Sequence, residues 1–250
     1  DAFGYSLSLS NDGNVLAIGS PSIASTTNTG DLKIYSFDNV NSSNSDWQLM
    51  GPVINGESIG DQFARSISLS DDGMTVASGA RYNDGSSSNS GYNSGRIKVY
   101  RFDPSQLIWS QMGGDIDGVS DDFFGSSLAL NGDGSVLLGS GTNGGNGYGV
   151  ARVYQYTNSN WRKLGTDILG EGWGDQFGSS ASFSDQESIV ALGATQNNGS
   201  GSTAGHVRVF SVLIPLTGVY TIDPNSSGTR NYTSFTSAIS DLNSKGISGP

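Results

Sequence analysis

Short runs of alternating apolar and polar residues recur along the chain, separated by stretches rich in Gly, Ser and Asn. Four runs share one form, in which a basic residue stands between two apolar residues and an aromatic residue follows: Leu32–Tyr35, Ile97–Tyr100, Ala151–Tyr154 and Val207–Phe210. Apolar side chains at every second position lie on one face of a β-strand. The runs therefore predict strands whose basic residue points outward on a solvated face.

These runs belong to a repeat of roughly 50 to 60 residues, the period of a whole supersecondary unit. The units start near residues 1, 61, 122 and 175, and the segments Asp1–Ser10 and Asp61–Ser70 align without a gap. In the first three units an Asp-Gly pair precedes the second apolar strand. Asp-Gly between apolar runs predicts a tight hairpin.

A further apolar segment closes the first three units, and it begins at Trp47, Trp109 and Trp161. The regular placement of these Trp residues predicts packing between neighbouring units rather than contact with a ligand. Four short antiparallel strands per unit are typical of a propeller blade. We therefore predict an all-β protein, a β-propeller made of four-stranded antiparallel blades, with about four blades present. A β-solenoid or a chain of small sandwiches has the same local pattern and stays open.

The repeat does not cover the whole chain. The fourth unit has no Trp segment, and no strand precedes the first unit to complete it, so we expect an incomplete ring. Beyond residue 213 the repeat stops, and Ala238, Ile239 and Leu242 have helical spacing. We interpret residues 1–213 as propeller repeats and residues 214–250 as a linker and the truncated start of a further domain.

Composition narrows the classes of partner. The 250 residues include 37 Gly, in keeping with many tight turns, and carry a formal net charge of −11. This charge repels phosphate backbones and anionic lipid surfaces, so we expect no nucleic acid partner. No apolar run approaches the length of a membrane span, so we expect no membrane insertion. The chain has no Cys and gives no evidence on redox compartment.

The phrase Gly-Asp-Gln-Phe-Gly-x-Ser stands at Gly174–Ser180 and nearly at Gly60–Ser66. Together with the Ser-x-Asp-Gly and Val-Ala-x-Gly words that follow, it resembles the FG-GAP-like repeats of integrin α-type propellers, in particular those of large bacterial surface proteins. The resemblance covers residues 1–212. It implies an extracellular propeller, commonly seven-bladed, in a secreted or cell-surface protein whose downstream domains are further partners.

Such blades often hold calcium in an acid-rich hairpin, which makes calcium the one cofactor that the resemblance implies. A hard cation takes six to eight oxygen ligands. The corresponding hairpins here offer one or two acids each, at Asp12, Asp72 and Asp133. The alternative is that these acids only form the turns.

A second acidic set recurs where one unit passes to the next. Its members could bind a cation across two blades, or could cap the turns by accepting backbone N–H groups. The set comprises Glu57, Asp61, Asp117, Asp121, Asp122, Glu171 and Asp175.

Trp173 is the candidate for a ligand contact, because the equivalent position in the first unit is Ile59, which is not aromatic, so Trp173 departs from the repeat. The variable Gly-, Ser- and Asn-rich segments within residues 20–30, 83–95, 141–149 and 195–205 are the expected ligand-facing loops. His206, the single His, is expected to be a surface strand residue.

The sequence contains no acid or nucleophile whose placement departs from the repeat, so we predict that the chain is not an enzyme. We predict a non-catalytic extracellular binding or display module, adhesive in character, with a protein or glycan ligand. Two alternatives stay open: a structural spacer for a downstream domain, and a fragment of a glycan-processing enzyme, whose chemistry would need two facing carboxylates.

Overall fold

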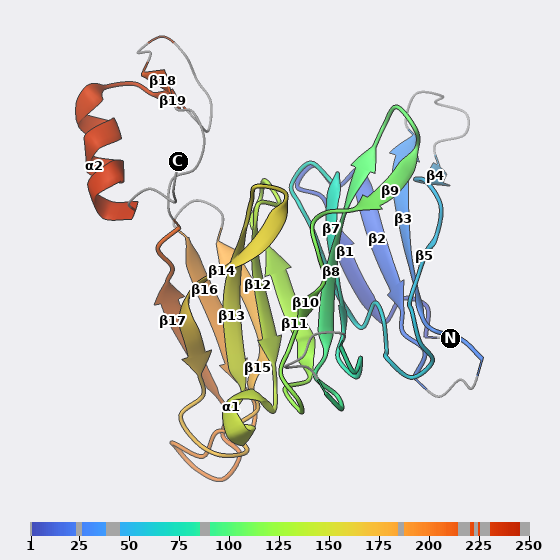
Figure 1. Ribbon diagram of the computed structural model, residues 1–250, viewed down its shortest axis with the longest axis vertical. Coiled ribbons are helices and arrows are strands. Elements are labelled where there is room, and N and C mark those ends of the chain that lie inside the picture. Colours follow the sequence, from blue (N-terminus) through green and yellow to red (C-terminus); the bar gives the residue numbers. More distant parts are fainter. Residues whose placement is uncertain are drawn as a thin grey trace. The chain divides into compact units, whose positions relative to one another are not determined.

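The computed structural model describes residues 2–23, 27–38, 46–85, 91–184, 188–214, 221–222, 225 and 231–245. The chain divides into two compact units, residues 1–210 and 211–250. The first unit contains four antiparallel sheets, here called blades 1 to 4 in chain order (Figure 1). The predicted all-β propeller fold is confirmed, and within the described residues no strand pairing closes the four blades into a ring.

The strands of each blade follow one another along the chain. Blade 1 contains β1 (Ser6–Leu9), β2 (Val15–Ser20), β3 (Asp31–Asp38), β4 (Asp46–Leu49) and β5 (Ile54–Asn55). Blade 2 contains β6 (Ser66–Leu69), β7 (Thr75–Ala80), β8 (Arg96–Asp103), β9 (Ile108–Gln111) and β10 (Ile116–Asp117). Blade 3 contains β11 (Phe124–Leu130), β12 (Val136–Gly141), the short turn α1 (Gly144–Gly147), β13 (Val150–Thr157) and β14 (Asn160–Leu169). Blade 4 contains β15 (Phe177–Ser184), β16 (Ile189–Ala194) and β17 (His206–Ser211).

The outermost strand differs between blades. In blades 1 and 2 it is broken into two pieces, β4 with β5 and β9 with β10, which both pair with the third strand. In blade 3 it is the single strand β14, whose pairing with β13 shifts register between Ala151 and Val153. Blade 4 has three strands in its described part, as expected from the missing Trp segment.

The Asp-Gly pairs make the first hairpin of blades 1 to 3. Gly13, Gly73 and Gly134 have φ between 68° and 73°, a conformation that a side chain disfavours. The preceding Asp accepts a backbone N–H two residues later, which closes the turn from the carboxylate side.

The core lies between the blades rather than within one sheet. Leu32 and Ile34 of β3 are at most 1% exposed, and they join one cluster with Ile67 and Leu69 of β6 in the next blade. A second cluster joins blades 2 and 3 in the same way. Packing between neighbouring blades therefore contributes hydrophobic stabilisation to both.

The predicted packing of the Trp residues between units is confirmed for two of them. The indole Nε1 of Trp109 donates to the carbonyl oxygen of Met50 in blade 1 at 2.6 Å, and that of Trp161 donates to Met112 in blade 2 at 2.7 Å. Trp47 of blade 1 is half-buried and packs against Phe37 of the same blade.

The prediction of a solvated basic face is wrong for the inner blades. Arg152 of β13 is only 7% exposed, and the side chain of Lys98 of β8 is 12% exposed. The alternation indicates which residues share a face, but neighbouring blades cover both faces of an inner blade. A charged side chain there lies in an interface and needs a partner.

The second unit has a short parallel pair, β18 (Thr221–Ile222) with β19 (Asn231–Tyr232), and the helix α2 (Phe235–Lys245). The hydroxyl of Tyr232 donates to the carboxylate of Asp241 at 2.9 Å. The helix expected from the spacing of Ala238 and Ile239 is α2. Much of the predicted segment 214–250 lies outside the described residues. Neither of the described helices has the length and apolar content of a membrane-spanning segment.

Candidate functional site

The acids of the Asp-Gly hairpins bond within their own turns. The carboxylate of Asp12 accepts the hydroxyl of Ser10 at 2.6 Å and both the backbone and side-chain N–H groups of Asn14. These bonds lower the pKa of Asp12 to about 2, and the bond from Ser10 has the largest effect. Asp72 accepts from Ser70 and Asp133 from Asn131 in the same way. This geometry fits the turn-forming alternative.

The acids at the blade junctions meet protein cations. In blade 2, Nη1 of Arg96 lies 2.6 Å from Glu57 and 3.0 Å from Asp115, while its Nε lies 2.7 Å from Asp117. Lys98 also contacts Glu57 and Asp115. Burial lowers the pKa of Arg96, but the bond to Asp117 and the surrounding carboxylates outweigh burial and raise it.

In blade 3 the acids surround Arg152, which stands at the repeat position of Lys98. Its Nη1 lies 2.7 Å from Asp122 of the preceding junction, and its Nε lies 3.0 Å from Asp167 of β14. Burial alone would raise the pKa of Asp167, but the hydrogen bond from Lys163 and the charge of Arg152 lower it. Asp167 is therefore held as an ionised carboxylate.

Blade 4 repeats the pairing in a more exposed form. Glu171 lies 3.3 Å from Nδ1 of His206 and 3.6 Å from Nε of Arg208, and its side chain is 54% exposed. The side chain of His206 is 37% exposed at the start of β17, the surface position expected from the sequence.

Asp61 and Asp175 instead accept side-chain amides. Asn83 donates to Asp61 at 2.5 Å, and Asn197 donates to Asp175 at 2.7 Å. Burial raises the pKa of Asp61 above its ordinary value. The space beside Asp61 and Arg96 measures about 10 Å³, room for one water molecule.

Among the described residues, the structure therefore shows no assembled set of ligands for the expected calcium ion. Within the described residues, no three His, Cys, Asp or Glu side chains gather into a group that could hold a metal ion. The junction acids instead contact side chains of Arg, Lys, His and Asn, and the calcium site stays an expectation of the family resemblance alone.

Sequence reasoning missed the role of the third-strand cations. Besides acids, three of them contact the ring of the Phe that opens the same unit: Lys33 lies 5.4 Å from the ring centre of Phe3, and Arg152 lies 5.2 Å from that of Phe124. Arg208 lies 5.4 Å from the ring of Phe177. The signal was available, because acid, Phe and cation keep fixed places in the repeat.

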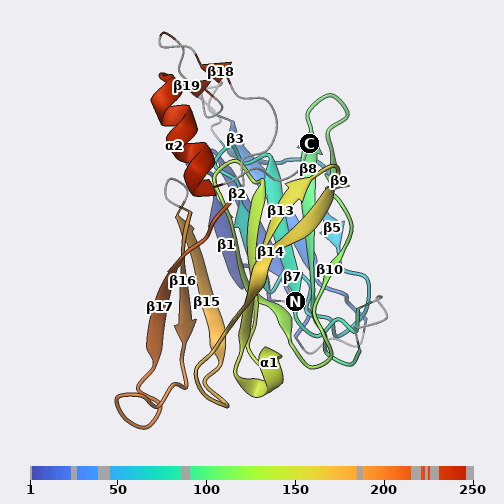
Figure 2. The ribbon, with the colours of Figure 1, turned by 60° about the vertical axis from the view of Figure 1, so that its left-hand side comes forward.

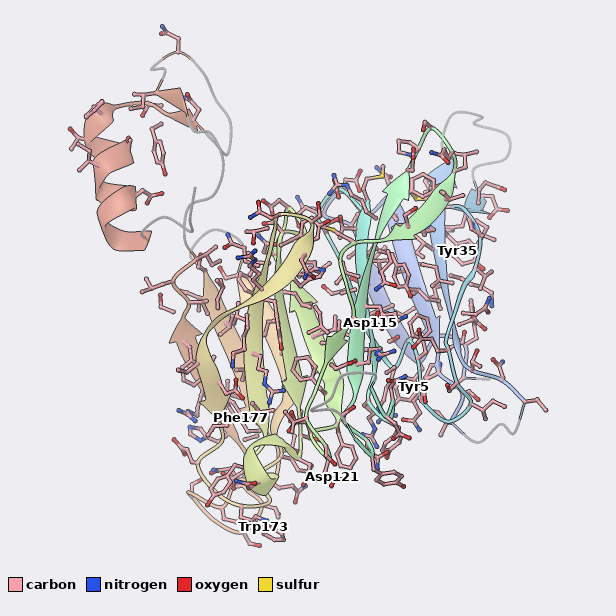
Figure 3. The ribbon with its side chains drawn as sticks, in the orientation of Figure 1. Tyr5, Tyr35, Asp115, Asp121, Trp173 and Phe177 are labelled. Carbon is pink, nitrogen blue, oxygen red and sulfur yellow. The ribbon has the colours of Figure 1, made fainter. Side chains whose placement is uncertain are left out.

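Trp173 lies at one end of the blades, near Asp121 (Figure 3). The side chain is 79% exposed. It borders an open groove of about 480 Å³, here called the Trp173 groove. The residues that line it are Val119, Ser120, Asp121, Asp122, Asn143, Gly145, Asn146, Gly147, Arg152, Asp167 and Trp173.

Three segments build the walls of this groove: the junction before blade 3, the β12–β13 loop and the junction before blade 4. The backbone N–H of Gly174 donates to Gly147 at 2.8 Å, and the side chain of Asn143 donates to the carbonyl of Asp121 at 2.9 Å. A Cβ on Gly147 would lie 2.6 Å from Nε1 of Trp173. The indole therefore lies against Gly147, a position where a side chain would be strained.

Of the four expected ligand-facing loops, residues 141–149 contribute to this groove. The loop within 195–205 lies at the same end of the blades (Figure 1). Parts of the other two loops, residues 24–26 and 86–90, lie outside the described residues.

No known protein-family model matches the sequence, and no curated protein matches it. Among solved structures, the chain is similar to hydrazine synthase of Kuenenia stuttgartiensis, with 11% identity and a TM-score of 0.49 over 83% of this chain and 46% of that one. It is also similar to a protein from Lactobacillus plantarum, with 16% identity and a TM-score of 0.49 over 77% and 48%. The chain thus spans about half the length of these two structures. The likeness concerns the fold alone, so the FG-GAP-like resemblance and the absence of catalysis stay predictions.

Proposed function

We propose that this chain is a non-catalytic binding module of a secreted or cell-surface protein, and that the Trp173 groove binds a neutral glycan. The observation that carries the proposal is the exposed indole of Trp173, held at the rim of a polar groove. Burying a large apolar side chain stabilises a protein by about 1.5 to 3 kcal/mol. Leaving an indole in water without function forgoes this gain.

The walls suit a sugar. The flat indole offers an apolar face to the C–H groups of a sugar ring, while its surroundings offer hydrogen-bonding groups for hydroxyls. Asp121, Asn143, Asn146 and Ser120 supply carboxylate, amide and hydroxyl groups along the groove. The acidic net charge disfavours anionic sugars.

The carboxylates at the base of the groove support binding rather than hydrolysis. Glycoside hydrolysis needs one carboxylic acid with a raised pKa to protonate the leaving group. Here Asp122 and Asp167 both pair with Arg152, and the pKa of Asp167 is lowered. Two carboxylates that both pair with one Arg are suited to holding the shape and charge of the groove.

The resemblance to FG-GAP-like repeats supports the extracellular location, because such propellers occur in surface and secreted proteins. Downstream domains of the same polypeptide would then be displayed or positioned by the module. Calcium has no part in the proposed site, since two of the acids of the groove, Asp122 and Asp167, already contact Arg152.

The test is a screen of the whole chain against a panel of neutral glycans, followed by calorimetric titration of the best binder. Trp173→Ala should weaken that affinity at least tenfold, or about 1.4 kcal/mol, because the stacking surface is lost. Ile59→Ala is the matched control, since Ile59 is 52% exposed at the equivalent place in the first unit.

Three outcomes would contradict the proposal. If no neutral glycan binds, the structural spacer is the better function. If a glycan binds equally well to Trp173→Ala and to Ile59→Ala, the binding site lies elsewhere. Release of reducing sugar from the same panel would revive the enzyme alternative.

A further inference from the structure

Contacts between consecutive blades follow a repeated pattern on the first strand. The hydroxyl of Ser8 in blade 1 accepts the backbone N–H of Leu69 in blade 2 at 2.9 Å. One blade further, Ser68 accepts the N–H of Leu130 at 3.0 Å. Blades 1 and 2 thus each offer a Ser forward, and blades 2 and 3 each offer a backbone N–H backward; blade 3 has Ala129 at the Ser position.

A second Ser on the same strand repeats with opposite polarity. The hydroxyl of Ser6 donates to the carbonyl of Ala64 in blade 2 at 2.7 Å, and that of Ser66 donates to Gly125 in blade 3 at 2.7 Å. These bonds tie the first strand of one blade to the opening loop of the next.

Blade 4 carries the forward half of this pattern without a following blade. Ser180 and Ser182 of β15 occupy the places of Ser6 and Ser8, and both are exposed. Val207 and Val209 of β17 are 66% and 64% exposed. These four residues form what is here called the forward face.

The same strand positions are buried wherever a next blade is present. Val207 and Val209 occupy the places of Leu32 and Ile34 in blade 1. Those two side chains are 0% and 1% exposed beneath blade 2. The forward face therefore has the composition of an interface.

Blade 1 carries the other half of the pattern. Leu7 and Leu9 of β1 are 62% and 58% exposed, whereas Ile67 and Leu69, at the same places in blade 2, are 9% and 7% exposed against blade 1. With Gly13 they form what is here called the back face.

The turn glycines show the same contrast. A Cβ on Gly73 would lie 2.6 Å from Val15 of the preceding blade, and one on Gly134 would lie 2.8 Å from Thr75. A Cβ on Gly13 would meet no described atom within 4 Å. In blade 4 the residue that corresponds to Val15 is Ile189, which lies beside the forward face in the sequence of the repeat.

We propose that the forward face of one copy of this chain docks on the back face of a second copy, head to tail. The second copy is the occupant because it carries the complement of the exposed pattern. Ser182 then accepts the N–H of Leu9, and Ser180 donates to the carbonyl of Gly4, as their equivalents do between blades 1 and 2.

The two faces lie at opposite ends of the blade array (Figures 1 and 2). A head-to-tail contact between unlike faces makes a ring if the rotation closes, and rings of up to eight blades are known. Two copies supply eight blades. The contact lacks the Trp-to-Met bond that joins blade 1 to blade 2 and blade 2 to blade 3, because blade 4 has no fourth strand in its described part, and it is therefore weaker than those two interfaces.

Sedimentation velocity of the whole chain over about 1 to 100 μM tests the proposal, a range that covers micromolar dissociation constants. The unmodified chain should form dimers at the upper end. Leu7→Arg, which charges only the back face, and Val209→Glu, which charges only the forward face, should each sediment as monomers. Leu107→Arg, at a 63% exposed position in the β8–β9 turn, should leave the dimer intact.

Mixing the two charged variants in equal amounts separates head-to-tail docking from other modes. Each mixed pair has one unaltered contact, so the mixture should recover a heterodimer. Circular dichroism melts check that each variant folds, and Leu9→Arg with Val207→Glu is the second pair if one does not. A chain that stays monomeric, as it would if residues 214–250 covered a face, overturns the proposal. So does a mixture that stays monomeric while the unmodified chain dimerises.

Discussion

At the scale of single residues, Arg152 connects most of the local chemistry. Its guanidinium pairs with Asp122 from the preceding junction and Asp167 from β14, and it lies over the ring of Phe124. Asp122 is 4% exposed, so without Arg152 its charge would be buried and unpaired. Breaking a buried ion pair on one side costs more than the pair itself contributes.

We therefore expect Arg152→Leu to lower the free energy of unfolding by about 3 kcal/mol. Urea denaturation at neutral pH measures the change. Lys163 also pairs with Asp167, but the Lys163 side chain is 41% exposed. Lys163→Ala should therefore lower the free energy of unfolding by less than about 0.5 kcal/mol. Equal effects of the two substitutions would show that burial of the pair is not what matters.

At the scale of elements, the blade interface depends on the first strand, the Asp-Gly hairpin and the outer-strand Trp. Trp109 is 9% exposed and bonds to a carbonyl of the preceding blade, whereas Trp47 is half-buried in blade 1. Trp47 and Trp109 occupy the same repeat position, but we expect Trp109 to contribute more to the free energy of unfolding.

Trp109→Phe should therefore lower the free energy of unfolding by about 1 to 3 kcal/mol, because it leaves the carbonyl of Met50 buried without its donor. Trp47→Phe should cost less than half as much. Chemical denaturation of both variants under one set of conditions gives the comparison. A larger loss at Trp47 would contradict the account of the blade interface.

Strand order, hairpins and blade count were predictable because they follow from local patterns in the sequence. The surroundings of the third-strand cations were not. Arg96 and Glu57 are 39 positions apart, and their contact depends on which blade faces which. The alternation of apolar and polar residues predicted which residues share a face of the strand with Arg152. It did not predict that a neighbouring blade covers that face.

The candidate groove was predictable only in part. Trp173 departs from the repeat, and that departure singled it out. The contribution of Asn143 and Gly147 needed the positive-φ turn at residues 145–147, which brings the β12–β13 loop against the indole. A single sequence does not indicate such a long-range contact.

At the scale of the whole molecule, the acids that could have held calcium are engaged by Arg, Lys, Asn and backbone groups. We expect the melting temperature of the chain in millimolar calcium to match that in chelator within about 1 °C, at matched ionic strength, because a ligand raises stability only by binding the native state. Magnesium is the control cation. A rise of several degrees with calcium alone would show that a cation site exists.

The central claim is that the Trp173 groove is the binding site of the module. The chain has four Trp residues, so a sample labelled with 5-fluorotryptophan gives four fluorine resonances, and Trp173→Phe assigns one of them. Titration with the best neutral glycan should shift the Trp173 resonance and leave those of buried Trp109 and Trp161 in place. A titration that shifts another Trp resonance while that of Trp173 stays fixed would contradict the claim.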